Sequence, residues 1–560
     1  MVVLTRSLLP LTSLLVSSVT ASPIGESFVK KIARQDGSFY AITGVNTGTV
    51  EPRLEIRELK QQPEAWNLFL LALQRFKAMD QSDKISFFQI AGIHGEPLIP
   101  WDGVQATGDA SVGYCPHGSN LFGTWHKPYL AVFEQVLNLK AQEIAAEFPA
   151  GPTRDAYVNA ASKLRLPFWD WALPRPSNEK ILTPLLSDPT AEVTYPNGTT
   201  ATIVNPLAGY TFHPLVPSDF GYPWSLWTHT ARNPRTNTNP SLPDNIDGVE
   251  SFLVGTYNGI RNTLYQILTQ YQTFNQFSNT GSEQTEIGTL EGIHNIIHGS
   301  FGSGHMGYPA VAAFDPIFWL HHCNVDRIMN IFQAIYPDTF VTAHEQFGAT
   351  YMNEPGDVWD AETPLAPFHS STSGDFWTSN SARPIPVFGS TYPELVDNPS
   401  NDTIKERINA LYAPAVTSLK KRQAGAEHKP RAYLAVIEAP FALDGTFSVD
   451  VFIGDITTDG ANWPTDPNFV GAQTMLAKPG LTSNAVVKGS VVLTEALQKK
   501  YDAGSLKSLD VDAVVEYLKT QLHWRVEKVR LLPLLCSPMP VLTGICNRIG
   551  KSLLASRCPI

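Results

Sequence analysis

The chain has 560 residues, a length that suggests two or more domains. Of these residues 43% are hydrophobic and 17% are charged, a composition typical of a globular protein. Its formal net charge of -11 argues against nucleic acid or an anionic membrane surface as a partner. Beyond the amino-terminal region, the apolar stretches are shorter than the roughly 20 residues needed to span a bilayer. We therefore expect no membrane-embedded segment.

Residues 1–21 have the pattern of a secretory signal sequence. Arg6 supplies the positive end, residues 8–19 form a short apolar run, and Val19-Thr20-Ala21 is a small-residue cleavage site. We therefore predict the secretory route and a secreted or cell-wall-associated protein, with an uncleaved intracellular amino terminus as the alternative. Sequons beginning at Asn197 and Asn401 are candidate glycosylation sites.

The next elements lead to a first group of histidines. Residues 40–46 read as a short strand, and apolar residues at helical spacing predict helices over 65–79 and 125–140. Three histidines lie in apolar, aromatic-rich segments of this region, namely His94, His117 and His126. We expect His117 to lie on a loop and His126 near the start of its helix.

Asp170 lies between two tryptophans in the sequence LPFWDW at 166–171. Its carboxylate could accept the ring N–H of a metal-binding histidine, or it could cap a helix or turn. Residues 173–250 are rich in Pro, Asn and Thr and are expected to form long irregular loops, followed by a helix over 251–275.

A second group of histidines follows between residues 290 and 327. His294 and His298 are four residues apart and would share one face of a helix. Asp315-Pro316 predicts the start of the next helix, with Asp as N-cap, and this helix carries His321 and His322 among apolar residues. Imidazole rings in such surroundings need partners, and a metal ion suits several of them at once.

Two groups of three histidines suggest two metal ions. Imidazole ligands suit copper, zinc, iron or nickel, and disfavour magnesium and calcium. Neither group has a carboxylate at ligand spacing, which argues against a di-iron site built on Glu-x-x-His pairs. Asn295 follows His294 directly, which argues against the HExxH motif of zinc proteases.

The carboxy-terminal part of the chain has a different pattern. Residues 401–412 predict a short helix, and the polar, basic stretch 418–431 reads as a linker. It contains the dibasic pair Lys421-Arg422, which a secretory-pathway protease could cut. Residues 431–456 alternate as in a β-hairpin, and 522–534 resemble a final strand, so we predict a mainly β domain.

Six segments resemble the type 3 copper proteins, and among them the fungal tyrosinases. They occur in the family order over about 230 residues: IHG at 93–95, GYCPHG at 113–118, TWHKPYL at 124–130, LPFWDW at 166–171, IHNIIHG at 293–299 and DPIFWLHHCNVDR at 315–327. Six linked motifs identify a family far more specifically than one histidine pair does.

The resemblance implies two copper ions as cofactors, with O2 as co-substrate. The first copper would be bound by His94, His117 and His126, and the second by His294, His298 and His322. His321 would be a supporting neighbour. Cys115 would be joined to His117 by a thioether, or would remain a plain buried thiol. Phe318 resembles the aromatic residue that stacks beside the ligands.

The resemblance also implies a fold. A mainly α catalytic domain, with a four-helix-bundle core that holds the dicopper site and with long loops, would occupy residues 40–400 after a leader at 22–39. A linker at 401–429 would lead to a smaller, mainly β shielding domain at 430–560. In that domain, Cys536, Cys546 and Cys558 could form one disulfide and one free thiol, or could assist copper loading.

The implied function is ortho-hydroxylation of monophenols and oxidation of o-diphenols to o-quinones, in the formation of melanin or of phenolic secondary metabolites. The enzyme would be latent until the β domain is removed. Glu291 and Asn295 match positions that hold a proton-accepting water in monophenol-active members, although Glu291 could be an exposed helix residue and Asn295 a supporting amide.

Two other functions stay open at this point. One is a catechol or o-aminophenol oxidase without monophenol activity, and the other is a haemocyanin-like oxygen carrier. The expected partners are small phenols, and the sequence leaves open whether the chain forms a homo-oligomer.

Overall fold

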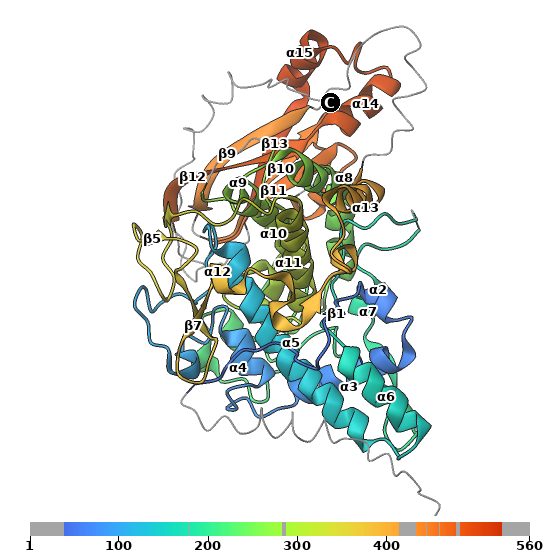
Figure 1. Ribbon diagram of the computed structural model, residues 1–560. Coiled ribbons are helices and arrows are strands. Elements are labelled where there is room, and N and C mark those ends of the chain that lie inside the picture. The colour runs from blue at the N-terminus through green and yellow to red at the C-terminus, as the bar shows by residue number, and fades with distance from the viewer. Residues whose placement is uncertain are drawn as a thin grey trace, which may run out of the picture.

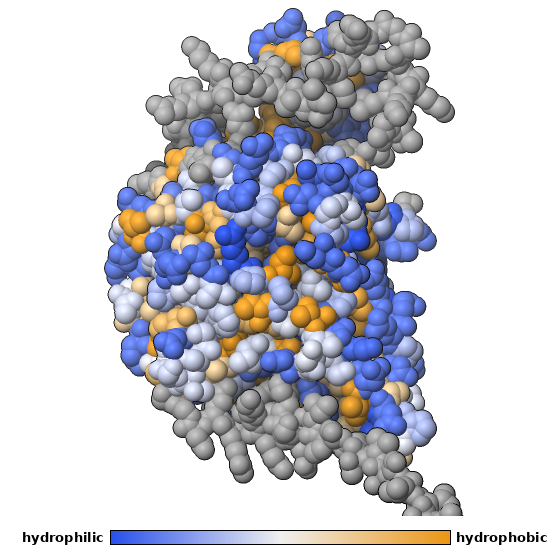
Figure 2. All heavy atoms as spheres, viewed as in Figure 1, coloured by the Kyte–Doolittle hydropathy of each residue, from blue (hydrophilic) through white to orange (hydrophobic). Residues whose placement is uncertain are grey.

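The structure is a computed structural model that describes residues 39–528, apart from 177, 283–286, 414–432, 444, 459 and 478–481. The predicted signal sequence and the dibasic pair Lys421-Arg422 lie outside the described residues, as do Cys536, Cys546 and Cys558. Among the described helices, none combines the length and the apolar character that a bilayer-spanning helix requires. Figure 2 shows hydrophilic and hydrophobic residues mixed over the face in view.

Four helices form the centre of the molecule (Figure 1). They are α5 (Phe122–Glu147), α8 (Ile246–Gln270), α10 (Leu290–Gly299) and α11 (Ile317–Ile335). Almost every side chain of α5 and α11 is buried, and buried charged groups such as Glu134 and Arg327 form ion pairs in the interior. The helix predicted from Trp125 begins earlier, at Phe122, so Pro128 lies inside the helix and not in its first turn.

Further helices and small sheets surround this centre. The helices are α2 (Ile56–Leu59), α3 (Pro63–Lys77), α4 (Phe87–Gly92), α6 (Pro152–Lys163), α7 (Pro184–Ser187), α9 (Phe274–Ser278), α12 (Ser379–Ala382) and α13 (Asn401–Tyr412). The strands pair two by two: β1 (Glu51–Pro52) with β8 (Ser390–Thr391), β2 (Thr190–Thr194) with β3 (Thr200–Val204), β4 (His344–Glu345) with β5 (Val358–Trp359), and β6 (Pro364–His369) with β7 (Phe376–Thr378).

Two local predictions for this part were wrong. Residues 40–46 form no strand, since Ile42 N–H donates to His369 O and Val45 N–H to Phe388 O without a continuous ladder. Residues 173–250 are not uniformly irregular, because β2 and β3 form an antiparallel hairpin within them. The turn between these strands carries Asn197, whose side chain accepts the N–H of Thr199.

The carboxy-terminal part is mainly β, as predicted. It contains β9 (Leu434–Leu443), β10 (Phe447–Ile453), β11 (Phe469–Met475), β12 (Thr482–Val492) and β13 (Leu522–Lys528), with α14 (Thr494–Asp502) and α15 (Val511–Gln521) at the far end. The predicted hairpin of consecutive strands was wrong, because β9 pairs with β12 whereas β10 lies between β11 and β13.

The β-rich part packs directly on the helical core. β11 lies against α10, and Ala472 of β11 belongs to the same buried cluster as the residues of the central helices. Val449 and Val451 of β10 belong instead to the apolar clusters of the β-rich part itself. One face of this sheet therefore covers α10, as Figure 1 shows.

Candidate metal centre

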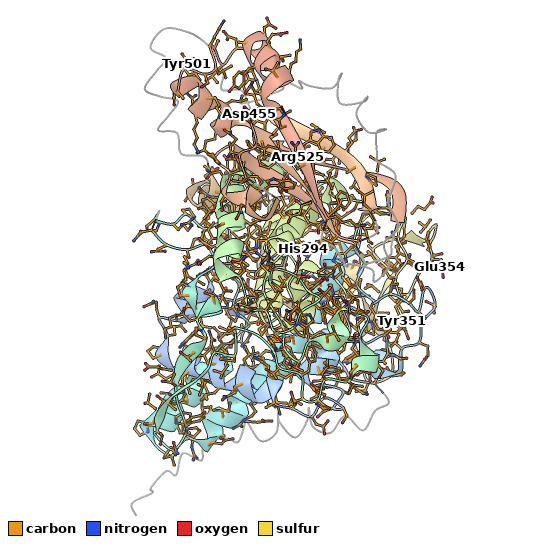
Figure 3. The ribbon with its side chains drawn as sticks, turned by 180° about the vertical axis from the view of Figure 1, so that it is seen from behind. His294, Tyr351, Glu354, Asp455, Tyr501 and Arg525 are labelled. Atoms are coloured by element: carbon orange, nitrogen blue, oxygen red, sulfur yellow. The ribbon has the colours of Figure 1, made fainter. Side chains whose placement is uncertain are left out.

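The helices bring the six predicted ligand histidines together. His94 follows the end of α4, His117 lies on a loop, and His126 is in the second turn of α5. His294 and His298 share one face of α10, and His322 lies in the second turn of α11. Figure 3 places His294 in the interior, beneath the carboxy-terminal strands. Five of the rings are buried and His117 is partly exposed.

The histidines of α10 and α11 converge through their Nε2 atoms. His322 Nε2 lies 3.2 Å from His294 Nε2 and 3.5 Å from His298 Nε2. Two nitrogens bound to one metal at near-tetrahedral geometry are about 3.3 Å apart, given metal–nitrogen distances of about 2.0 Å. The spacing of these three rings therefore fits one metal ion.

Hydrogen bonds at the Nδ1 atoms of three rings fix the tautomer that metal ligation needs. Nδ1 of His94, His126 and His298 lies 2.6, 2.7 and 2.6 Å from the carbonyl oxygens of Pro309, Phe122 and Met306. A carbonyl can only accept, so these rings carry their proton on Nδ1 and present a lone pair on Nε2.

His294, the first histidine of α10, has a side-chain oxygen as the partner of its Nδ1 in place of a main-chain carbonyl. His294 Nδ1 lies 2.8 Å from Oδ1 of Asn295. At the other site, Nε2 of His94 is buried without a partner among the described residues. A buried lone pair without a protein partner is available to a metal ion.

Burial keeps these rings neutral. It lowers the pKa of His126 to about 3 and that of His298 to about 4. Burial also lowers the pKa values of His94, His294 and His322 well below the usual range, and repulsion between neighbouring imidazoles adds to the effect. Neutral imidazoles are the form that binds metal, so ligation needs no deprotonation near neutral pH.

The two groups of histidines form one centre. The rings of His126 and His322 are stacked with centroids 4.2 Å apart. Ligand atoms of His94, His126 and His322 lie within 4.8 Å of one another. Phe318 packs beside them, with its centroid 4.1 Å from that of His322 and 4.9 Å from that of His94.

His321 also lies in the second group, but it has a different partner. Trp171 Nε1 donates to His321 Nδ1 at 3.2 Å, which leaves the ring proton of His321 on Nε2. His322 Nε2, by contrast, is directed at the other two nitrogens. The geometry therefore favours His322 as the ligand, and Trp171, which the sequence pattern did not single out, as a residue that orients His321.

Cys115 is close enough to His117 for a covalent link. Its Sγ lies 3.7 Å from Nδ1 and 3.8 Å from Nε2 of that ring. The sulfur lies closer still, at 3.4 Å, to Nε2 of His126. Burial raises the pKa of the Cys115 thiol well above its usual range.

Glu291 and Asn295 both lie in the interior on α10. Glu291 is 1% exposed, so it is not a surface residue of the helix. Its carboxylate accepts the N–H of Gly118 at 2.6 Å, and the N–H and hydroxyl of Thr280 at 2.8 and 2.9 Å. Burial raises the pKa of Glu291 to about 7, although these hydrogen bonds oppose the shift.

Asp170 does not hold a histidine ring. One carboxylate oxygen accepts the N–H of Ala172, which is the turn cap that we considered as the alternative, and the other binds Arg327 at 3.3 Å and the hydroxyl of Tyr412 at 2.7 Å. The helix cap at Asp315 is nearly as predicted. Its carboxylate accepts the N–H of Ile317 at 3.1 Å, although the helix begins one residue later than expected.

The chain matches two family models: "Common central domain of tyrosinase" over residues 84–335 and "Tyrosinase C-terminal domain" over residues 433–533. It is 31% identical to a tyrosinase of Neurospora crassa, over 87% of this chain and 90% of that protein, and 32% identical to polyphenol oxidase 4 of Agaricus bisporus, over 84% and 80%.

Solved structures agree with this match. The structure of latent and active mushroom tyrosinase has a TM-score of 0.75 and 29% identity, covering 87% of this chain and 91% of that one. The holo-protyrosinase of an Aspergillus species shares the fold with a TM-score of 0.70 at 22% identity, over 83% and 90%.

Proposed function

The chain belongs to the tyrosinase family and is a tyrosinase-type oxidoreductase; we propose that it binds two copper ions, hydroxylates monophenols and oxidises o-diphenols to o-quinones with O2. The observation that carries the proposal is the convergence of six imidazoles on one buried centre, with metal-like spacing between the Nε2 atoms of His294, His298 and His322. Melanin or a phenolic secondary metabolite would be the final product.

The residues present fit copper. His94, His117 and His126 would hold one ion, and His294, His298 and His322 the other. Bound copper would supply the electrons that reduce O2. The protein supplies six imidazole ligands, and hydrogen bonds fix the outer nitrogens of four of them, those of His94, His126, His294 and His298, which favours a low-charge, soft-to-borderline ion over magnesium or calcium. The proximity of Cys115 to His117 supports a thioether that would restrain this partly exposed ligand.

A monophenol must lose its proton before it reacts, and Glu291 with Asn295 would hold the water that takes it. A base works best when its pKa lies near the working pH, and that of Glu291 is raised to about 7. Asn295 lies one turn further along α10, with its Oδ1 bound to His294. Both groups would then act from the helix that carries two of the ligands.

The β-rich part would keep the enzyme latent. Its strand β11 covers α10, and Gln473 and Thr474 lie beside Gly292 and Gly299 of that helix. We extend the proposal to the chain organisation: a catalytic domain at 40–400, a linker with a cutting site at Lys421-Arg422, and a shielding domain from 430. The secretory route and removal of residues 1–21 complete the proposal.

The test is oxygen uptake by copper-loaded protein with tyrosine and with DOPA, before and after proteolysis between residues 412 and 433. Turnover of tyrosine that appears only after cutting would support a latent tyrosinase. Reversible oxygen binding without turnover in either form would overturn the enzyme proposal in favour of an oxygen carrier.

A second candidate is an o-diphenol oxidase without monophenol activity. The observation that favours it is that three protein donors already bind the Glu291 carboxylate, so it has less capacity left for a water. Glu291→Gln decides between the two. If Glu291 holds the base, the variant loses monophenol turnover much more than diphenol turnover; if both rates fall by the same factor, the residue only supports the fold.

A further inference from the structure

The loop of residues 115–120, here called the His117 loop, is held from three directions. Glu291 accepts the N–H of Gly118 at 2.6 Å. The side-chain amide of Gln346 donates from Nε2 to Oδ1 of Asn120 at 2.9 Å, and Nδ2 of Asn120 donates to the carbonyl oxygen of Thr342 at 2.8 Å. A segment more than 200 residues away in the sequence therefore fixes the loop that carries His117.

Phe347 follows Gln346 and lies directly on the loop. A Cβ atom at Gly118 would collide with the Phe347 ring, and so would one at Gly281. Gly118 also has a φ of +61°, a conformation that favours glycine. The ring therefore occupies the space that the two glycines leave free. Gly281 follows Thr280, the second residue bound by Glu291.

The outer side of Phe347 contacts the β-rich part. Its ring meets that of Phe441 in β9 edge to face, with centroids 4.9 Å apart. Phe347 also packs against the apolar cluster that contains Ala439, Phe441 and Met475. Phe347 is half-buried even with this contact, so removal of β9 would leave one side of its ring open.

We propose that Phe347 is a positioning residue for His117, and that Phe441 of the β-rich part holds Phe347 against the His117 loop. Removal of the β-rich part would then have two effects: it uncovers the centre, and it loosens the loop of one copper ligand. This inference rests on the proposed role of His117 as a ligand.

The experiment measures amide hydrogen exchange in the copper-free, full-length chain. The reporters are the N–H groups of Gly118 and Thr280, which exchange only when their hydrogen bonds to Glu291 open. Phe347→Leu and Phe441→Leu are expected to speed both by about fivefold, on the scale of one aromatic contact. Phe347→Tyr keeps the ring and is expected to restore slow exchange.

Phe469→Leu is the matched control. Phe469 of β11 also meets an aromatic ring of the helical core, that of Phe252 in α8, with centroids 6.5 Å apart. Its other aromatic partner among the described residues is Phe452 of β10, so its ring contacts lie outside the His117 loop. Unchanged exchange in this variant, with faster exchange in Phe441→Leu, is the expected result. Equal exchange in all three Leu variants, whether fast or unchanged, would overturn the proposal.

A second measurement uses the cut, copper-loaded enzyme. There Phe347→Leu should still lower kcat, whereas Phe441→Leu should match the wild type because Phe441 has been removed with its domain. A persistent effect of Phe441→Leu would contradict the mechanism. Since the exchange experiment needs no copper, a failure of the wild-type chain to bind copper or turn over phenols would refute the proposed function without deciding the role of Phe347.

Discussion

Gly299 of α10 lies close against Thr474 of β11, and we expect Gly299→Ala to weaken latency. An alanine Cβ at this position would lie 2.6 Å from Oγ1 of Thr474, 3.0 Å from its Cγ2 and 3.2 Å from its Cβ. Thr474 is 1% exposed and is held in a strand, so it cannot turn into solvent. Either the side chain or the strand must move.

Gly292 provides a matched control on the same helix. A Cβ there would lie 3.5 Å from Oγ1 of Thr289 and 3.7 Å from Nε2 of Gln473, which are ordinary contacts. Gly292 lies in the first turn of α10 and Gly299 is its last residue, so neither substitution gains the full helix propensity of about 1 kcal/mol that Gly→Ala gives in a helix interior. Overpacking at Gly299 costs about 1–3 kcal/mol in addition. The ratio of docked to undocked β-rich part should therefore fall by about 5- to 150-fold in Gly299→Ala alone.

The assay is DOPA oxidation by the uncut, copper-loaded chain, with the cut enzyme measured beside it. Basal activity should rise in Gly299→Ala by the factor above, up to the activity of the cut enzyme, and should stay near the wild-type value in Gly292→Ala. After cutting, all three proteins should have similar rates, because the clash has been removed. Equal basal activity of the two variants would refute the reasoning, and a rate that stays altered after cutting would place the effect at neighbouring His298 instead.

Three further predictions concern stability. Asp315→Asn removes the charge that pairs with buried Arg232 at 2.7 Å. It should lower the free energy of unfolding by about 3–5 kcal/mol in urea titrations. Glu516→Gln, in an exposed ion pair with Lys519, should change this free energy by less than about 1 kcal/mol. Burial raises the pKa of Asp450 from 3.8 to about 7, so its protonated form stabilises the fold at low pH. This contribution, about 4 kcal/mol, is lost as the pH rises from about 4 to 7. Asp450→Asn should therefore flatten the decline in stability over this pH range. Copper at 100 times its Kd should raise the free energy of unfolding by about 2.7 kcal/mol over the copper-free chain, and a melting temperature that chelation leaves unchanged would contradict the centre.

Local sequence patterns predicted the helices and the histidine groups well. The helix predicted at 401–412 is α13 with the same bounds, and the second histidine group lies on two helices as expected. Helix periodicity, caps and i,i+4 spacing depend on residues that are near in sequence, which is why they can be read from the sequence alone.

Features that depend on distant residues were not predictable. The hairpin prediction for β9 and β10 failed because β9 pairs with β12 and β10 with β11 and β13, strands that lie up to about 80 residues further along the chain. Of the two roles considered for Asp170, the turn cap was found, but its ion pair could not be predicted for the same reason. Its partners, Arg327 and Tyr412, come from segments more than 150 residues away, and nothing in LPFWDW indicates them.

The ion pair between Asp170 and Arg327 is one example of how charge is distributed in the core. Three of the histidines donate to main-chain carbonyls, which orient a ring without adding charge to it. The buried carboxylates of the same helices are used elsewhere. Glu134 of α5 and Asp326 of α11 both bind Arg53, at 2.8 and 3.1 Å, two turns beyond His126 and one turn beyond His322.

This separation has a chemical consequence. A carboxylate on the outer nitrogen would make an imidazole more basic and would favour the more highly charged state of a bound metal. Carbonyl partners leave the ligands neutral, and Arg53 and Arg327 compensate the carboxylates of Glu134, Asp326, Asp170 and Glu394 by ion pairs, whereas Glu291 is bound by uncharged donors. A neutral ligand set of this kind suits the copper of the proposed function, although zinc, iron and nickel also bind imidazole. Introduction of a carboxylate beside His298 Nδ1 would therefore be expected to disturb the chemistry of the centre more than its fold.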